Sequence, residues 1–258
     1  MSAFERITPV TGAPCWVNLM APDLRAAQSF YASVMDWDFR DSDLGSDFSV
    51  AMAHGSPVAG IGSRSPAIGP PTVWTPYFAV KHADETADRV RERGATLTIG
   101  PLNLGEGRAA LATDRDGAVF GFWEGPALTW SVRYGSAPAR LDLQTRDAFE
   151  AAVFYAEVFG WARPPGGCMV DYAQDHVFVQ VAGRTVVTLR GGGVESAPDP
   201  KIRPRWIVDF HVPDIERSAA AATAAGGEFS PVASHAGSSK TAYVIRDPDG
   251  GLFTVSEV

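Results

Sequence analysis

The spacing of apolar residues near the start of the chain changes from that of a strand to that of a helix. In the segment 16–20 the aliphatic residues Val17 and Leu19 alternate with larger or polar ones, which is the period of a β-strand. Asp23, a little farther on, is a typical N-cap residue. After it, apolar residues recur at helical spacing; they are Leu24, Ala27, Tyr31 and Val34. The pattern predicts a strand followed by a helix that covers one face of a sheet.

This order, a strand followed by a helix and then by short strands, occurs four times along the chain. In the second occurrence a helix follows the strand 74–80, and we expect Asp84 to cap it and Gly94 to end it. The first helix should end near Asp36 and its repeat at Gly160, because both residues tolerate a left-handed backbone. Further short strands are predicted at 48–53, 57–61, 108–112, 118–123, 176–182 and 185–189. Four such modules predict an α+β fold.

The second half of the chain repeats the first. The segment PDLRAAQSFYASVMDW (22–37) returns as RDAFEAAVFYAEVFGW (146–161), and DRDGAVFGF (114–122) returns as DPDGGLFTV (247–255). A repeat that takes up about half of a chain indicates two copies of a domain. The predicted division is a first domain at 13–125 (modules at about 13–63 and 72–125), a linker at 126–137, and a second domain at 138–258 (modules at about 138–190 and 203–258).

The repeated motifs resemble those of the vicinal oxygen chelate superfamily, which includes glyoxalase I, bleomycin-resistance proteins, fosfomycin-resistance enzymes and extradiol dioxygenases. The resemblance rests on the run from Ala21 to Trp37 and on the D-x-D-G-x-x-F run at 114–120, and it covers nearly all of residues 13–258. It implies two tandem domains, each built of two βαβββ modules that form a cupped mixed sheet around a cleft.

Composition and charge narrow the classes of partner. The chain has 258 residues, of which 45% are hydrophobic and 20% charged, and its formal net charge is −8. A negative charge favours neither nucleic acid nor an anionic membrane surface, and no apolar run is long enough for a signal-peptide core or a membrane span. Cys15 and Cys168 form no C-x-x-C pattern, so we expect free thiols in a reducing cytoplasm.

Alternation along the central strands predicts which side chains face the two clefts. The first cleft should be largely apolar, and its predicted ligand-binding residues are Trp16, Asn18, Tyr77 and Trp123. The corresponding residues of the second cleft are polar or charged, namely Arg140, Asp142, Gln144, Asp209 and His211. Buried charges are costly unless they are paired or hydrated. Two interpretations therefore remain: Arg140 pairs with an aspartate in a structural seam, or the set binds a polar ligand.

The resemblance also implies where a metal ion would bind. Metal-using members of the family carry His or Gln at the start of a module's first strand and Glu on its last strand. In this chain the first-strand positions are Trp16, Thr75, Arg140 and Ile207, and the last-strand positions fall near Gly60, Gly121, Thr188 and Thr254. None of these is a strong ligand of a divalent cation, and Arg140 would repel one. We therefore expect no metal at the family's usual position and no cofactor.

Three functions remain open from the sequence. The first is a cytoplasmic glyoxalase-like protein that binds a small organic molecule without metal, and the resemblance implies a role in resistance or secondary metabolism. The second is a glyoxalase-like enzyme, a lyase, isomerase or hydroxylase-like catalyst, in which Asp209 and His211 transfer protons or hold a metal atypically. The third is a degenerate repeat that contacts another protein. Because members of the family often pair through their sheets, the resemblance also leads us to expect a homodimer.

Overall fold

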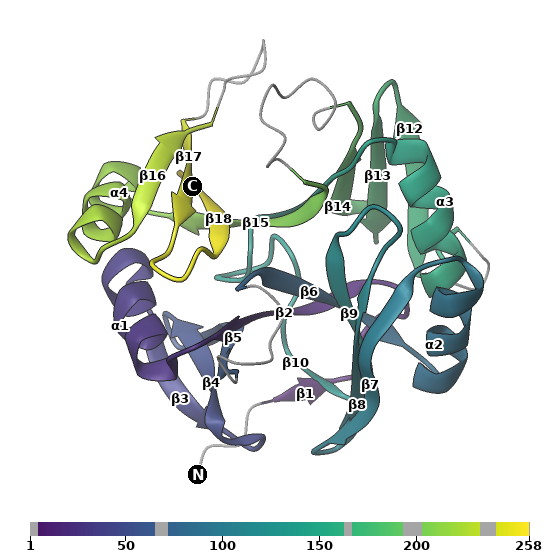
Figure 1. Cartoon of the computed structure of the whole chain (residues 1–258), viewed down its shortest axis with the longest axis horizontal. Helices are drawn as coiled ribbons and strands as arrows, with labels where there is room; N and C mark the ends of the chain where they lie inside the picture. Colours follow the sequence, from purple (N-terminus) through teal and green to yellow (C-terminus); the bar gives the residue numbers. More distant parts are fainter. Residues whose placement is uncertain (1–4, 65–71, 163–166, 193–202, 233–240, 258) are drawn as a thin grey trace. The chain divides into compact units, whose positions relative to one another are not determined.

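The computed structural model describes residues 5–64, 72–162, 167–192, 203–232 and 241–257. It contains two eight-stranded mixed sheets, one formed by each half of the chain (Figure 1). The elements of the first half are β1 (Arg6–Ile7), β2 (Pro14–Ala21), α1 (Leu24–Met35), β3 (Asp38–Ser42), β4 (Gly45–Ala53), β5 (Ser56–Ser63), β6 (Trp74–Val80), α2 (Ala83–Glu92), β7 (Thr96–Leu104), β8 (Gly107–Thr113), β9 (Val119–Glu124) and β10 (Ala127–Leu128). Those of the second half are β11 (Arg140–Gln144), α3 (Ala148–Phe159), β12 (Cys168–Ala173), β13 (His176–Val181), β14 (Arg184–Arg190), β15 (Arg205–Val212), α4 (Ile215–Ala224), β16 (Glu228–Pro231), β17 (Ala242–Arg246) and β18 (Leu252–Glu257). The predicted α+β fold is confirmed.

The strand order shows the plan of the modules. The first sheet has the order β3-β4-β5-β2-β6-β9-β8-β7, and the second has the order β12-β13-β14-β11-β15-β18-β17-β16. In each module the first strand pairs in parallel with the last, as β2 with β5, β6 with β9, β11 with β14, and β15 with β18. The other strands form antiparallel pairs. Parallel pairing needs a crossover connection, and the helix of each module lies within that crossover.

The compact units of the chain do not follow its two halves. One unit consists of Met1–Trp16, Thr75–Val132 and Arg140–Trp206, and the other of Val17–Trp74, Arg133–Ala139 and Ile207–Val258. Each unit thus takes one helix from each half, α2 with α3 in the first and α1 with α4 in the second (Figure 1). The division of the chain at 126–137 describes the sequence repeat and stays a prediction for the domains.

Side-chain hydrogen bonds join the two helices of each unit. In the first unit Nε of Arg89 donates to the carbonyl oxygen of Val158, near the end of α3, at 3.1 Å. In the second unit Oγ of Ser218 donates to the carbonyl oxygen of Val34, near the end of α1, at 3.0 Å. Each contact satisfies a carbonyl in the last turn of a helix, where no intrahelical partner follows.

The two repeated motifs meet in buried hydrogen-bond relays. In the first unit the hydroxyl of Tyr155 donates to Oδ2 of Asp114 at 2.8 Å and accepts from Nε1 of Trp206 at 3.1 Å. The second unit repeats this arrangement with Tyr31, Asp247 and Trp74, at the same two distances. The Phe-Tyr motif of one half therefore binds the Asp-x-Asp-Gly motif of the other half.

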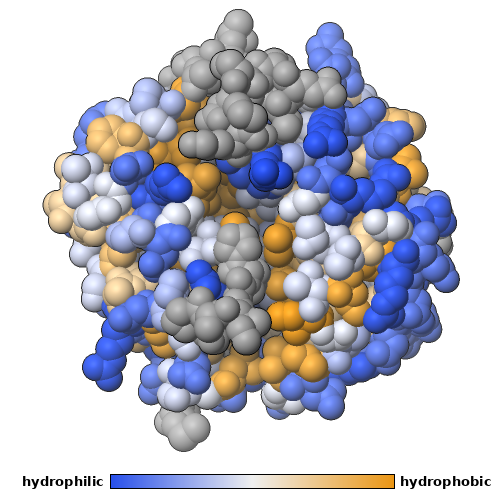
Figure 2. Space-filling view, in the orientation of Figure 1, coloured by the Kyte–Doolittle hydropathy of each residue, from blue (hydrophilic) through white to orange (hydrophobic). Residues whose placement is uncertain are grey.

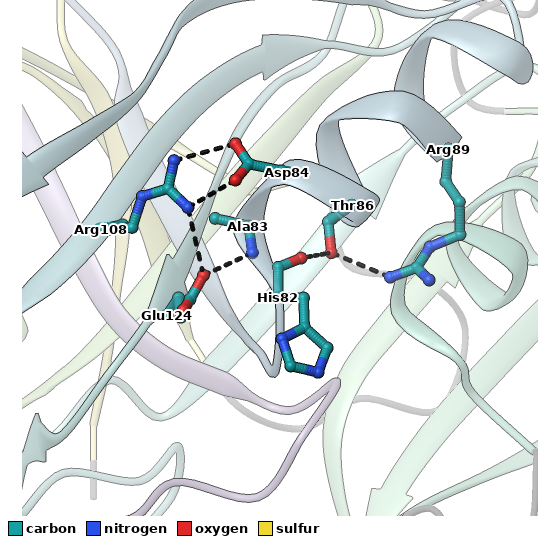
Figure 3. Close-up of polar contacts among 7 residues, drawn as sticks. All are labelled: His82, Ala83, Asp84, Thr86, Arg89, Arg108 and Glu124. Atoms are coloured by element: carbon teal, nitrogen blue, oxygen red, sulfur yellow. Dashed lines mark hydrogen bonds and ion pairs between the residues drawn. The ribbon is translucent and has the colours of Figure 1, made fainter.

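The ends of two helices agree with the prediction, and the start of a third does not. Asp36 and Gly160 end α1 and α3 in the left-handed region, with φ of 57° and 74°. At α2, however, the N-cap residue is His82, whose side chain makes no cap hydrogen bond. The carboxylate of Glu124, at the end of β9, caps the helix instead: it accepts from the backbone N–H of Ala83 at 2.6 Å (Figure 3).

The expectation that Asp84 caps α2 was therefore wrong, and the reason is a competing ion pair. Both carboxylate oxygens of Asp84 accept from Arg108 on β8, at 2.8 and 2.9 Å (Figure 3). This hydrogen bonding lowers the pKa of Asp84. In the same cluster Oγ1 of Thr86 donates to the carbonyl oxygen of His82 at 2.9 Å. The start of α2 is thus held by residues from β8 and β9.

Two further expectations concern the membrane and the cysteines. Among the helices in the described ranges, none combines the length and apolar character needed to cross a membrane. Cys15 and Cys168 are free, as expected, and the structure shows that both are buried. Burial raises the pKa of each thiol to about 12, so both are protonated and unreactive at neutral pH.

Candidate functional site

Two aromatic side chains share one face of β6 and β9 in the first compact unit. The parallel register places Tyr77 opposite Gly121 and Ala79 opposite Trp123, so Tyr77 and Trp123 project from the same face. The other face of these strands carries the fully buried residues Phe78, Phe120 and Phe122. Burial of the three phenylalanines fixes the orientation of the strands, and it leaves Tyr77 and Trp123 half-buried.

Glycines lie directly beneath both rings. A Cβ at Gly121 would overlap the ring of Tyr77, and a Cβ at Gly107 on β8 would overlap the ring of Trp123. The indole of Trp123 is held further because its Nε1 donates to the carbonyl oxygen of Pro126 at 3.0 Å. We call the surface formed by Tyr77, Trp123, Gly107 and Gly121 the aromatic face. A glycine inside a strand signals this kind of close approach, so Gly107 and Gly121 are the sequence features that could have indicated this surface.

Apolar residues extend the aromatic face toward the edge strand β7. Leu111 lies opposite Gly121, and Ile99 lies opposite Leu111, so both project from the face that carries Tyr77. The exposed fractions of Ile99 and Leu102 are 45% and 50%. Figure 2 shows hydrophobic surface in the region where Figure 1 labels β8 and β9. The surface around Tyr77 and Trp123 is therefore suited to an apolar ligand.

The other two residues predicted for the first cleft, Trp16 and Asn18, both belong to β2. Trp16 is half-buried in the first unit, where its ring packs against that of Trp130 with centroids 5.9 Å apart. Asn18 belongs to the second unit and lies opposite Gly60 on β5. Ligand binding by all four residues together stays a prediction.

The residues at the family's metal positions do not fit a metal centre. At Gly121 the ring of Tyr77 occupies the space that a glutamate side chain would need. At the corresponding positions of the second half, Thr188 lies opposite Asp142, and Thr254 lies opposite Asp209. Within the described part of the chain, no group of three or more His, Cys, Asp or Glu side chains is placed to hold a metal ion.

A second candidate site lies on β11, β13 and β14, also in the first unit. Asp142 lies opposite Thr188, and Arg190 lies opposite both Gln144 and His176. The side chains of Asp142, Gln144, His176, Thr188 and Arg190 all project from one face of the sheet. The opposite face carries buried aliphatic residues, namely Leu141, Leu143, Val177, Val187 and Leu189. We call the polar side of these strands the polar face; it is formed by Arg140, Asp142, Gln144, His176, Thr188 and Arg190.

Charged groups on the polar face surround one buried carboxylate. Oδ2 of Asp142 lies 3.6 Å from Nε of Arg140 and 3.6 Å from Nη2 of Arg190. Nη1 of Arg190 lies 3.3 Å from Nε2 of His176. The expected ion pair between Arg140 and an aspartate is thus present. Arg190 and His176 were not among the predicted site residues, because only the register of β13 and β14 brings them beside Asp142.

Asp209 and His211 are connected through a residue that the sequence analysis missed. Oγ of Ser256 on β18 donates to Oδ2 of the buried Asp209 at 2.9 Å and lies 3.3 Å from Nδ1 of the exposed His211. Because the serine has one proton and gives it to Asp209, the imidazole N–H donates to Oγ. The serine lies between the other two groups, so this is not the arrangement of a hydrolytic triad, in which histidine lies in the middle.

Sequence comparison identifies relatives over nearly all of the chain. Residues 14–122 match the family model described as "Glyoxalase/Bleomycin resistance protein/Dioxygenase superfamily", and residues 140–256 match "Glyoxalase-like domain". "Putative glyoxylase CFP32" of Mycobacterium tuberculosis is 30% identical over 252 residues, which cover 95% of this chain and 94% of that protein. "Anthracycline biosynthesis protein DnrV" of Streptomyces peucetius is 28% identical over 265 residues, which cover 96% of this chain and 94% of that protein.

Solved structures show the same fold at low sequence identity. The Mn(II)-bound glyoxalase from Novosphingobium aromaticivorans has a TM-score of 0.58 at 16% identity, over 96% of this chain and 82% of that one. A catechol 2,3-dioxygenase has a TM-score of 0.58 at 14% identity, over 97% of this chain and 89% of that one. A likeness at these identities bears on the fold and not on the activity.

Proposed function

We propose that this chain, which belongs to the Glyoxalase/Bleomycin resistance protein/Dioxygenase superfamily, binds a small planar organic molecule on its aromatic face without the family's usual metal ion. Tyr77 and Trp123 are the residues that would contact this molecule. The observation that carries the proposal is the ring of Tyr77 over Gly121. An aromatic ring stands where the family resemblance would place a metal-binding glutamate.

The energetics of stacking support a planar ligand. A pair of aromatic rings contributes about 0.5–1.5 kcal/mol beyond the burial of area, and offset or edge-to-face geometries are preferred. Tyr77 and Trp123 are anchored from below by the sheet and, for Trp123, by the hydrogen bond to Pro126. Anchored rings lose little conformational entropy when a ligand binds. A saturated molecule of the same size would gain only the free energy of burying apolar area, without the contribution of ring stacking.

The names of two relatives bear on the class of ligand. One relative is named "Anthracycline biosynthesis protein DnrV" and another "Putative glyoxylase CFP32", and anthracyclines contain planar fused rings. We propose a role in small-molecule resistance or secondary metabolism for this chain. Cys15 and Cys168 are free thiols, which supports a reducing cytoplasm as its location. A homodimer remains part of the proposal through the family resemblance alone.

Calorimetric titration of the full chain with naphthol and with its saturated counterpart decahydronaphthol tests the proposal. The planar compound should bind about fivefold more tightly for each aromatic contact, since about 1 kcal/mol corresponds to that ratio. Tyr77→Leu and Trp123→Leu should each reduce this preference. Tyr134→Leu is the matched control, because Tyr134 is 62% exposed and lies outside the aromatic face. Equal affinities for the two compounds, or an unchanged preference in a folded Trp123→Leu protein, would exclude the aromatic face.

A second candidate function, a glyoxalase-like enzyme, is favoured by the contacts of Ser256. They orient the imidazole of His211, as acid–base chemistry requires. The enzyme should then isomerise the hemithioacetal of methylglyoxal and glutathione, and His211→Gln should abolish this turnover while Ser256→Ala reduces it. Absence of turnover in the unaltered protein, or turnover that survives His211→Gln, would eliminate this candidate.

A further inference from the structure

We propose a second ligand site, on the polar face of β11, β13 and β14, for a small organic anion that carries a hydroxyl group beside its carboxylate. The inference goes beyond the proposed function and does not depend on it, because the aromatic face belongs to other strands. It starts from Asp142, which is 7% exposed. Oδ1 of Asp142 is buried and has no hydrogen-bond partner among the residues that the structure describes.

The orphaned oxygen determines the donor that a ligand must bring. An ionised carboxylate only accepts hydrogen bonds, and a buried acceptor that is left without one costs free energy. The other oxygen, Oδ2, lies 3.6 Å from nitrogens of Arg140 and Arg190, which is too long for good hydrogen bonds. The charge of Asp142 is thus compensated, while its hydrogen bonding is incomplete. A hydroxyl group that donates to Oδ1 would complete it.

The arginines determine the charge of the ligand. Two guanidinium groups lie beside the single carboxylate of Asp142, so the surroundings of Asp142 are positive and disfavour a metal cation or an ammonium group. The side chains of Arg140 and Arg190 are 43% and 35% exposed, which leaves surface for a ligand. Guanidinium groups bind carboxylates with parallel hydrogen bonds. A carboxylate beside Arg190 and a hydroxyl group at Asp142 together describe a hydroxy acid.

An aromatic wall limits the shape of that hydroxy acid. Phe178 lies opposite Thr188, so it projects from the polar face. The rings of Phe178 and His176 are nearly parallel, with an interplanar angle of 10° and centroids 6.1 Å apart. A hydroxy acid with a phenyl group would reach this wall while its polar groups contact Asp142 and Arg190. Mandelate is such a compound, and phenylacetate is the same acid without the hydroxyl group.

Calorimetric titration of the full chain with mandelate and phenylacetate tests the site. Mandelate should bind roughly tenfold more tightly, because only its hydroxyl group donates to the buried carboxylate. In Asp142→Asn this preference should fall below about threefold, since a neutral acceptor makes a weaker hydrogen bond. Arg190→Gln should weaken both acids. Arg184→Gln is the matched control, because Arg184 is exposed at the far end of the same strand, and it should change neither affinity.

Several results would overturn this site. Equal affinities of the two acids for the unaltered protein would do so without any variant, and so would the absence of mandelate binding at millimolar concentration. A hydroxyl preference that survives Asp142→Asn would also do so. Naphthol should bind Asp142→Asn and Arg190→Gln with unchanged affinity, so a failure of the polar face is distinguishable from a failure of the aromatic face.

Discussion

The hydroxyl of Tyr155 connects three segments that lie far apart in the sequence. It donates to Asp114 and accepts from Trp206. Burial raises the pKa of this hydroxyl well above its ordinary value, and the neighbouring charge of Asp114 raises it further. Burial also raises the pKa of Asp114, although its hydrogen bonds to Tyr155 and to the backbone of Ala118 oppose the rise. A single phenolic group thereby satisfies two other buried polar groups.

Removing this hydroxyl should lower the stability of the protein. Tyr155→Phe removes the hydroxyl that hydrogen-bonds Oδ2 of Asp114 and Nε1 of Trp206, and a buried polar group left unsatisfied costs about 1–3 kcal/mol. Tyr31→Phe should have a similar effect in the second relay. Urea unfolding measures both, with Tyr134→Phe, at a 62% exposed position, as the control. A loss no larger than that of the control would show that the relays do not stabilise the fold.

The same tyrosines predict how stability changes at alkaline pH. Their folded-state pKa values are raised above the unfolded value of about 10, so above that pH the unfolded chain loses protons that the folded chain keeps. The contribution of these tyrosines to the free energy of unfolding is therefore fully present below about pH 10, and it declines as the pH rises further. The unfolding free energy should fall more steeply with pH in the unaltered protein than in a protein with both Tyr31→Phe and Tyr155→Phe. Equal slopes in the two proteins would contradict the shifted pKa values.

Single elements show which features are local enough to be predicted from sequence. The alternation in 16–20 predicted the buried face of β2, since Val17 and Leu19 are fully buried. Asp36 and Gly160 were predictable helix ends, because the tolerance of a residue for the left-handed conformation depends on its own type and not on distant parts of the chain. The cap of α2 was not predictable, because Glu124 reaches it from the end of another strand.

The partners of the repeated motifs were likewise not predictable. Both motifs are visible in the sequence, but local pattern does not determine which copy of one binds which copy of the other. Of the candidate sites, alternation predicted Tyr77 and Trp123 on a common face. It missed Arg190 and Ser256, since their proximity to Asp142 and Asp209 depends on strand register.

The packing of Tyr77 on β6 against Gly121 on β9 should be sensitive to a single added methyl group. Gly121→Ala should lower stability by about 1–3 kcal/mol, because the new Cβ overlaps the ring of Tyr77 and an overpacked site must shift. It should also weaken naphthol binding by displacing the ring. Adding Tyr77→Leu should restore part of the lost stability, and a double-mutant cycle measures this coupling. Strictly additive effects would mean that the ring does not rest on Gly121.

The composition of the compact units makes a prediction for the whole molecule. Each unit takes a helix from both halves, so the halves depend on each other for α1–α4 and α2–α3 packing. Residues 1–125 and 138–258, produced separately, should each lack a cooperative thermal transition and regain one when mixed. A cooperative transition in either half alone, close to that of the full chain, would show that the halves fold independently.

At the scale of the whole molecule, the central claim is that the protein binds its ligand without a metal ion. Protein purified without added metal should contain far less than one equivalent of Zn, Ni, Fe or Mn, and a chelator should not shift its melting temperature, because a tightly bound ion would stabilise the fold by mass action. The decisive measurement is the affinity for naphthol before and after chelation, with the metal content determined on the same samples. Binding by Tyr77 and Trp123 predicts the same affinity in both samples. A near-stoichiometric metal whose removal abolishes naphthol binding would contradict it.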